Sequence, residues 1–283
     1  MGAPPRGPER LRGPGGQARP AADRGRARGL GGEQVEGRQA VAELLRAGRR
    51  RVHEVWLAAE AEPAPILEEI VALAERARVP VRRVARARLE GAARTDAPQG
   101  VVARAESLPE ADVDDLWRPG REGAPPLLIA FDGVTDPHNL GALLRSAEAA
   151  GATGALLPRH RAAHVTPAVA KAAAGAIERV PIALVGGLPA TLARAAEAGV
   201  WVVGLTTEGG ENLYRTRLGE GPVLVVVGAE GAGLSRLVRQ RCDILVTIPL
   251  QGALASLNVA VAGAVALFEL ARQRAEAKSS PTH

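Results

Sequence analysis

The sequence predicts an α/β protein of two units, the second of which contains a parallel β-sheet. Three observations lead to this prediction. Apolar runs of strand length alternate with stretches of helical periodicity, a Pro/Gly-rich segment at residues 105–126 interrupts that alternation, and 46% of the 283 residues are hydrophobic, enough for one large or two modest cores. We therefore expect a small α/β domain at residues 33–104, a linker at 105–126 and a larger α/β domain at 127–274.

The two ends of the chain have a composition that does not build a core. Residues 1–32 are rich in Gly, Pro and Arg and hold seven arginines against two acidic residues, whereas the rest of the chain is formally neutral in a protein of net charge +5. Such a tail suits non-specific attraction to phosphate backbones, and the alternative is compositional drift in a GC-rich genome. We expect residues 1–32 and 275–283 to be disordered.

In the first unit, apolar residues at helical spacing alternate with short β-type runs. Val41, Leu44 and Leu45 fall on one face of a helix, and residues 52–57 alternate like a strand. The expected helices are 34–46, 66–78 and 89–95, and the expected strands are 52–57, 79–84 and 101–103. These elements make a small α/β unit that ends near residue 104.

From residue 127 onward, strands and helices alternate as they do in a parallel sheet. Residues 127–131 and 223–227 are apolar runs that suit buried strands. The expected strands are 127–131, 154–157, 200–205, 223–227 and 244–248, and a short segment at 180–182 precedes one of the helices. The expected helices are 139–150, 167–175, 190–198, 234–240 and 257–274.

Composition excludes several classes of protein. No apolar run approaches the roughly 18–20 residues that span a bilayer, and the N-terminus lacks the apolar core of a secretory signal. The single cysteine, Cys242, excludes an internal disulfide and suits a reducing cytoplasm, and the five histidines show no metal-ligand spacing. We expect a cytoplasmic protein that does not span a membrane and binds no metal.

The first candidate site is the loop and helix at residues 132–145, which follow an apolar run. The chain turns through Asp136-Pro137 and restarts as a helix, and we expect Asn139 to be its N-terminal cap. Arg145 lies off the apolar stripe of this helix. That stripe consists of Leu140, Leu143, Leu144 and Ala147. A polar loop followed by an arginine suits a site, but an ordinary strand–turn–helix with a surface arginine explains the pattern at least as well.

The second candidate is a glycine-rich loop at residues 228–233, between an apolar run and a helix. Glycines such as Gly228 and Gly231 let backbone N–H groups approach a ligand, and a helix N-terminus favours negative charge. The spacing is G-x-x-G-x-G, which is neither the dinucleotide-binding fingerprint nor a Walker loop. As a lone glycine loop it is a weak signal.

The third candidate is the loop at residues 248–258, which leads into the last apolar helix. Ser256 and Asn258 carry groups that can position a ligand, but either residue can also simply cap the helix. Taken singly, each of the three loops has a structural explanation at least as good as its functional one.

In combination and in this order, the three loops resemble the SpoU/TrmH-type RNA ribose 2′-O-methyltransferases of the SPOUT superfamily. The resemblance covers residues 127–273 and includes Asn139 and Arg145 in the first loop region and Asn258 in the third. Residues 33–104 are similar to the substrate-binding domain of the bacterial 23S rRNA guanosine 2′-O-methyltransferases of this family, particularly those that modify the peptidyl-transferase region.

The resemblance implies a C-terminal SPOUT domain with a parallel sheet, in which the last segment threads a loop to form a deep trefoil knot. It also implies S-adenosylmethionine as methyl donor, RNA as substrate, no metal, and a homodimer packed through the knot region. The residues implied to hold the cofactor are Thr206, Gly228, Gly231, Ile248, Leu250 and Leu257. Those implied to take part in catalysis are Asn139, Arg145, Glu230, Ser256 and Asn258.

Methyl transfer to a ribose explains these residue types. A 2′-hydroxyl is a poor nucleophile at neutral pH, so the protein must orient it, ease the loss of its proton and hold the methyl group in line. The resemblance implies that Arg145 lies near the attacking oxygen. Because guanidinium groups stay protonated in proteins, electrostatic stabilisation of the developing alkoxide suits Arg145 better than a role as free base.

Three other functions remain open from the sequence. A tRNA 2′-O-methyltransferase would share the fold, but tRNA-specific members generally lack a domain like residues 33–104. A non-catalytic RNA-binding assembly factor would share the scaffold, and degraded motif residues would favour it, whereas here they are all present. The glycine spacing disfavours an oxidoreductase with a nucleotide cofactor.

Overall fold

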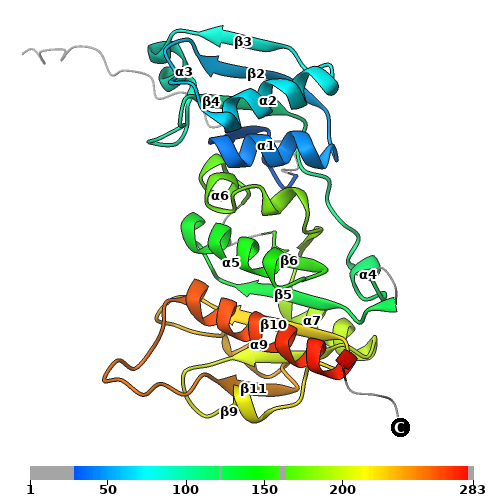
Figure 1. Cartoon of the computed structure of the whole chain (residues 1–283). Helices are drawn as coiled ribbons and strands as arrows, with labels where there is room; N and C mark the ends of the chain where they lie inside the picture. The colour runs from blue at the N-terminus through cyan, green and yellow to red at the C-terminus, as the bar shows by residue number, and fades with distance from the viewer. Residues whose placement is uncertain (1–28, 121–122, 160–163, 280–283) are drawn as a thin grey trace, which may run out of the picture.

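A computed structural model of the chain describes residues 29–120, 123–159 and 164–279, which form two α/β domains around separate sheets (Figure 1). The first sheet has the order β1-β4-β2-β3, in which β4 runs antiparallel to both neighbours and β3 is parallel to β2. Its strands are β1 (Gln34–Glu36), β2 (Val52–Ala58), β3 (Val81–Val84) and β4 (Val101–Ala105). Its helices are α1 (Arg38–Ala47), α2 (Pro65–Arg76) and α3 (Arg86–Ala92). Helices α1 and α2 pack on one face of the sheet, and α3 packs on the other.

The helix expected at residues 34–46 is wrong in its first turn. Residues 34–36 form β1, which pairs with β4, and the helix begins only at Arg38. The break comes at Gly37, whose φ of 97° is open to glycine but strained for other residues. The helix expected at 89–95 also starts earlier, at Arg86.

The second sheet confirms the expected parallel α/β domain. All of its neighbouring strands are parallel, in the order β7-β6-β5-β10-β8-β11-β9. The strands are β5 (Leu127–Asp132), β6 (Gly154–Pro158), β7 (Ile182–Val185), β8 (Trp201–Leu205), β9 (Glu211–Asn212), β10 (Val223–Gly228) and β11 (Ile244–Thr247). The two-residue strand β9 has no counterpart among the expected elements.

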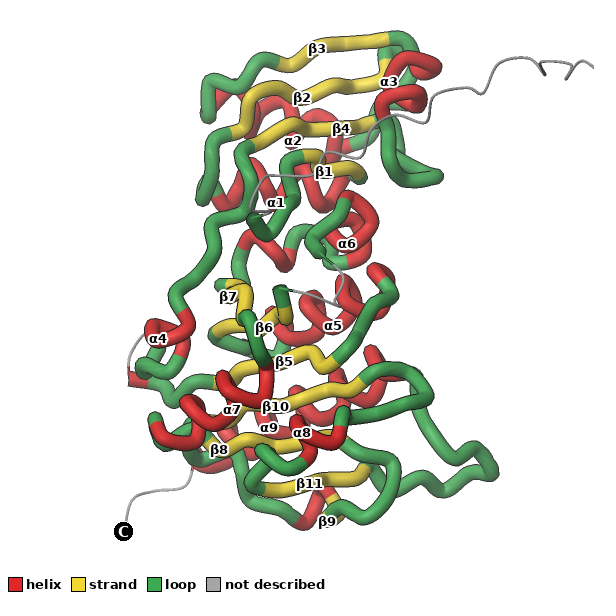
Figure 2. The backbone as a smooth tube through the Cα atoms, turned by 180° about the vertical axis from the view of Figure 1, so that it is seen from behind, coloured by secondary structure: helices red, strands yellow, loops and turns green. Residues whose placement is uncertain are grey.

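Helices cover both faces of this sheet (Figures 1 and 2). Ile129 and Phe131 of β5 face α5 (Pro137–Ala149), α6 (Pro167–Ala172) and α9 (Val259–Ser279). Leu128 and Ala130, which alternate with them, face α7 (Leu188–Glu197) and α8 (Arg236–Arg239). All four side chains are fully buried, as expected of a parallel sheet covered on both sides. Among the described residues, no helix is long and apolar enough to cross a membrane.

Two segments expected to lie outside the domains instead pack against the second domain. Leu30, in the expected tail, is 1% exposed and belongs to the core of the second domain, where its neighbour Gly31 bridges to Val165. The expected linker contains α4 (Val113–Leu116), whose Leu116 is buried against the sheet. Residues 1–28 of the expected tail lie outside the described residues.

The C-terminal helix is longer than expected. It was expected at residues 257–274, but α9 starts at Val259 and continues to Ser279, so residues 275–279 are helical rather than disordered. Arg272 supports this extension because it pairs with Glu269 one turn before it and with Glu276 one turn after it. Residues 280–283 lie outside the described residues.

A buried ion pair joins the two domains. Arg50, just after α1, donates from Nε and Nη2 to the carboxylate of Glu178 at 3.1 and 2.5 Å, and the side chains are 2% and 1% exposed. Glu178 belongs to the 3-10 helix η2 (Ala176–Glu178) of the second domain. Arg50 Nη1 also donates to the carbonyls of Gly32 and Glu106. The guanidinium of Arg50 thus contacts the chain just before the first domain, the chain just after it, and Glu178 of the second domain. These contacts hold the two domains together.

Candidate functional site

The three loops meet at one edge of the second sheet because the strands that lead into them are parallel. β5 and β10 run in register as far as Asp132 and Gly228, and β11 lies beyond β8 in the same sheet. Asp132 ties the first two loops together, since its Oδ2 accepts a hydrogen bond from Ser235 N at 2.6 Å. The carboxyl edge of an open α/β sheet is the usual place for a ligand site.

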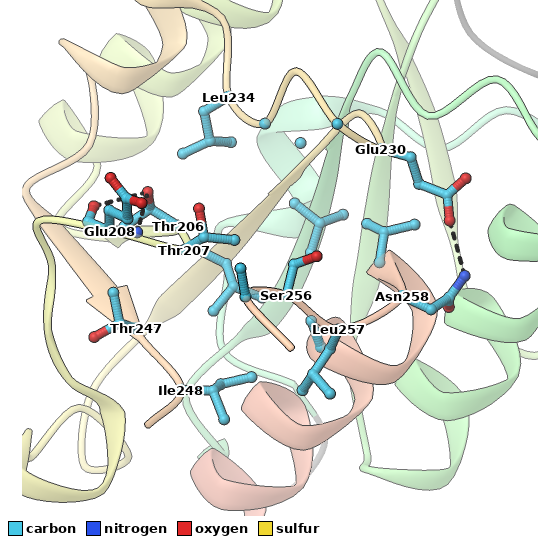
Figure 3. Close-up of a pocket in the computed structure, with 18 of the residues that line it drawn as sticks. Thr206, Thr207, Glu208, Glu230, Leu234, Thr247, Ile248, Ser256, Leu257 and Asn258 are labelled. Atoms are coloured by element: carbon cyan, nitrogen blue, oxygen red, sulfur yellow. Dashed lines mark hydrogen bonds between the residues drawn. The ribbon is translucent and has the colours of Figure 1, made fainter. Parts of the chain in front are cut away.

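The second and third loops and the end of β8 surround a cavity of about 840 Å³ (Figure 3). Its lining comes from residues 205–208, 227–234 and most of 247–259, together with Arg239 and Ala262. All six residues expected to hold the cofactor are among the lining residues: Thr206, Gly228, Gly231, Ile248, Leu250 and Leu257. Glu230, Ser256 and Asn258 also line the cavity, whereas Asn139 and Arg145 do not. The structure therefore brings the second and third loops together around one space.

A hydrogen-bond network joins the three loops. The Nδ2 of Asn258 donates to Asn139 Oδ1 at 3.0 Å and to Glu230 Oε1 at 2.8 Å, the second of which is drawn in Figure 3. The Oδ1 of Asn258 accepts from the backbone N–H of Ala260 at 2.9 Å and thereby caps α9. Asn258 thus has both of the roles that its sequence position allowed, as a helix cap and as a link between site residues.

The expectation that Asn139 caps its helix is wrong. The cap of α5 is Asp136, whose Oδ1 accepts from His138 N at 3.0 Å, and Pro137 follows at the first helical position, where proline is favoured. Asn139 lies in the first turn, is 8% exposed, and directs its amide oxygen to Asn258. Its side chain is therefore held by the site rather than by the helix terminus.

Arg145 and Ser256 have few constraints. Arg145 is exposed on α5, six residues after Asn139 and therefore about 9 Å further along the helix axis. Within the described part of the chain, its guanidinium has no ion pair or hydrogen bond. Ser256 is exposed in the third loop, and its hydroxyl likewise has no partner among the described residues. Both side chains are free to meet a substrate.

Two features of the site were missed from the sequence. Thr207 and Glu208 line the cavity beside the expected Thr206, because the chain leaves β8 along its rim (Figure 3). Asp132, the first residue of the first candidate loop, also accepts a hydrogen bond from Ser235 N just after the second loop, a contact that the sequence did not predict. A carboxylate that directly ends a buried strand is a signal that could have identified it.

The single cysteine of the chain does not offer the site a nucleophile. Burial raises the pKa of Cys242 to about 12, and the nearby carboxylates of Asp243 and Asp132 contribute to that rise. The thiol therefore stays protonated at neutral pH and does not act as a nucleophile. Across the described ranges, no three His, Cys, Asp or Glu side chains are grouped so that they could hold a metal ion.

Comparison with known proteins identifies both domains. Residues 126–268 match the family model described as SpoU rRNA Methylase family, and residues 34–111 match RNA 2'-O ribose methyltransferase substrate binding. A 23S rRNA (guanosine-2'-O-)-methyltransferase RlmB from Pseudomonas syringae pv. tomato is 44% identical over 256 residues, which cover 88% of this chain and 98% of the relative. A protein of the same name from Ralstonia nicotianae is 46% identical over 239 residues, covering 84% and 94%.

Solved structures share the fold. The SpoU methyltransferase AviRb from Streptomyces viridochromogenes, in complex with AdoMet, has a TM-score of 0.71 at 29% identity, covering 86% of this chain and 90% of AviRb. An AdoMet-bound rRNA methyltransferase from Sinorhizobium meliloti has a TM-score of 0.69 at 27% identity, covering 84% and 86%. A substrate-binding domain followed by a parallel sheet with a loop-lined pocket is the architecture of a SPOUT-type RNA methyltransferase. The chain belongs to the SpoU rRNA methylase family.

Proposed function

We propose that this protein transfers a methyl group from S-adenosylmethionine to a ribose 2′-hydroxyl in RNA, and that its target is a guanosine of 23S rRNA in the peptidyl-transferase region. The observation that carries the proposal is the 840 Å³ pocket, which is lined by the second and third loops and tied to the first through Asn258 and Asn139. The relatives that match most of the chain are named as 23S rRNA guanosine 2′-O-methyltransferases.

The lining of the pocket suits S-adenosylmethionine. Leu205, Val227 and Ile248 offer an apolar wall for the adenine, and the glycine loop at 228–233 offers backbone groups without intervening side chains. Glu208 adds a carboxylate at the rim that can pair with an ammonium group. When bound, S-adenosylmethionine supplies an electrophilic methyl group on a sulfonium.

The residues of the chain orient and activate the ribose hydroxyl. Asn258, held between Asn139 and Glu230, fixes the end of the third loop, so that Ser256 can present its hydroxyl to the ribose. Arg145 has no competing partner among the described residues and turns its guanidinium toward the oxygen that gains negative charge, directly or through a backbone phosphate. The new bond forms to the 2′-oxygen as the bond to sulfur breaks, and water takes the hydroxyl proton because a guanidinium cannot accept one.

Gly228→Ala is expected to weaken S-adenosylmethionine binding by about 10- to 100-fold, since the loss of one or two hydrogen bonds to the loop backbone costs about 1–3 kcal/mol. A Cβ at this position would lie 2.2 Å from the carbonyl carbon of Gly233 and 2.5 Å from Leu234 N. Both are backbone atoms, so the glycine loop must move. Isothermal titration calorimetry measures the effect.

Gly186→Ala is the matched control, because Gly186 also lies at the carboxyl end of a strand of the same sheet but has open space around it. It is expected to bind S-adenosylmethionine like the wild type. Equal affinities for the Gly228 and Gly186 variants would argue against the placement of the cofactor beside the glycine loop.

The function is tested by offering the protein labelled S-adenosylmethionine with unmodified 23S rRNA or with unmodified tRNA. The proposal predicts label in 23S rRNA and little in tRNA. The reverse preference would favour the tRNA enzyme, against which the matched substrate-binding domain at residues 34–111 already argues. No transfer to either RNA, with RNA binding retained, would favour an assembly factor.

The proposal includes a homodimer. Three apolar side chains on and just before α9 are exposed on the surface: Leu257 at 39%, Val261 at 49% and Phe268 at 50%. Val261 and Phe268 are seven residues apart on α9 and therefore lie on one helical stripe, and Leu257 comes two residues before the helix begins. An exposed apolar stripe beside the pocket suits the packing of a second copy of the chain.

Phe268→Glu is expected to convert dimers into monomers, because it places a charge in the apolar contact. Sedimentation velocity at micromolar concentration measures the change. Trp201→Glu is the control, since Trp201 is 52% exposed at the start of β8 rather than on α9. A Phe268 variant that remains dimeric would remove α9 from the interface.

A trefoil knot formed by the C-terminal segment and a cytoplasmic location complete the proposal. Membership of the family supports both, since the chain is similar over most of its length to enzymes named for the modification of ribosomal RNA.

A further inference from the structure

The outer face of the first sheet carries a tryptophan between two arginines. Trp56 of β2 alternates with the buried Val55 and Leu57, so its ring lies on the face away from α1 and α2. The guanidinium carbons of Arg88 and Arg104 lie 5.2 and 5.1 Å from the centre of its ring. Both distances are within the range of cation–π attraction, and both arginines are exposed.

This face carries an excess of positive charge. Arg82 and Arg104 share a single carboxylate, Glu54, at 3.2 and 3.7 Å, and their side chains are 63% and 50% exposed. Arg88 has no ion pair with any described residue. Two guanidiniums at one carboxylate and a third over the indole ring leave a net attraction for anions at this face.

The indole of Trp56 also has an unsatisfied hydrogen-bond donor. Its Nε1 is buried without an acceptor among the described residues. A buried donor without a partner is unfavourable, and most such groups in proteins are paired. A ligand oxygen that reached this N–H would supply the missing acceptor.

We propose that this outer face, defined by Trp56, Arg82, Arg88 and Arg104, is where a single-stranded segment of the RNA substrate docks. The arginines bind its phosphates, and a base stacks on the Trp56 ring in place of one guanidinium. Stacking on aromatic side chains beside cationic groups is the general mode of single-strand RNA recognition. The identity of the ligand as RNA rests on the proposed function. The outer face would be a second place, besides the methyl-transfer site, at which the RNA contacts the protein.

The arrangement of the domains supports a two-point contact. Figure 2 looks onto the outer face of the first sheet, and α3 lies on the same side of the molecule as the loop between β11 and α9. The buried pair of Arg50 and Glu178 fixes the first domain on the second. One RNA can therefore contact the outer face and reach the pocket at a set spacing.

The test is the affinity for in vitro transcribed 23S rRNA, measured without cofactor by filter binding over a range of salt concentrations. Trp56→Leu is expected to raise Kd about tenfold or more, whereas Trp56→Phe, which keeps an aromatic face, stays within about threefold of the wild type. The double variant Arg88→Gln/Arg104→Gln changes only exposed side chains. It is expected to raise Kd and to lower the salt slope by roughly 2, about 1 for each arginine that no longer binds a phosphate.

Arg76→Gln is the matched control, because Arg76 is exposed on α2, on the other side of the same sheet. It should leave Kd unchanged, and all variants should keep the wild-type rate at saturating RNA. Wild-type Kd values for both Trp56→Leu and the arginine double variant would overturn the proposal, as would preferential displacement of RNA by polyglutamate, which would indicate an acidic protein partner. Trp56-dependent RNA binding without methyl transfer would instead overturn the proposed function alone.

Discussion

Arg145→Ala is expected to lower the rate of methyl transfer by about 10²- to 10³-fold, the usual effect of removing one group that stabilises a developing oxyanion. Affinity for S-adenosylmethionine should stay within about twofold of the wild type, because Arg145 does not line the pocket. Its guanidinium has no partner within the described part of the chain, so its removal leaves no described group of the protein unpaired. Single-turnover transfer to 23S rRNA measures the rate.

Two further variants test whether the loss of rate is specific to the guanidinium of Arg145. Arg145→Lys keeps the charge but loses the planar set of donors, so it should recover only part of the rate. Arg194→Ala removes an exposed arginine from α7, on the opposite face of the sheet, and should leave the rate unchanged. If Arg145→Ala transferred methyl groups at the wild-type rate, the mechanism proposed for this residue would be wrong.

Arg50→Met is expected to lower the free energy of unfolding by about 3–5 kcal/mol, the cost of leaving one member of a buried ion pair without its partner. Glu178 would remain 1% exposed with no countercharge, and the carbonyls of Gly32 and Glu106 would lose a donor. Urea denaturation followed by far-UV circular dichroism measures the loss.

The neighbouring residue provides the control. Arg51 is exposed, and Arg51→Met should change the unfolding free energy by less than about 0.5 kcal/mol. Adding Glu178→Gln to Arg50→Met removes the unpaired charge and should restore part of the stability. An Arg50 variant as stable as the Arg51 variant would show that the ion pair does not hold the domains together.

Much of the fold was predictable because its strongest signals are local. The buried strands β5 and β10 are runs of apolar residues, and α5 has a clear apolar stripe, so each was recognised from its own residues. Leu30 was not, because a single apolar residue among glycines and arginines has no periodicity to reveal that it packs against Val165. The wrong cap at α5 could not be avoided from the sequence either, because Asp and Asn are both favoured caps. Only the structure shows that the helix begins after Asp136 and that Asn139 lies inside it.

The site shows the limits of sequence reasoning more clearly. Each loop alone had an adequate structural explanation, and only their resemblance to a known family in combination pointed to function. The contact between Asn139 and Asn258 joins residues 119 positions apart, and no spacing rule predicts it. The outer face around Trp56 was also not predicted, because its arginines come from two strands and a helix that meet only in the folded domain.

The central claim is methyl transfer to a ribose of 23S rRNA, and its most direct test is mass spectrometry of the modified RNA. Unmodified 23S rRNA is incubated with the protein and S-adenosylmethionine, digested, and compared with the same RNA incubated with Arg145→Ala. The account predicts one new 2′-O-methylguanosine in the peptidyl-transferase region, absent with the variant. A methyl group on a base, or no new modification of the RNA, would contradict it.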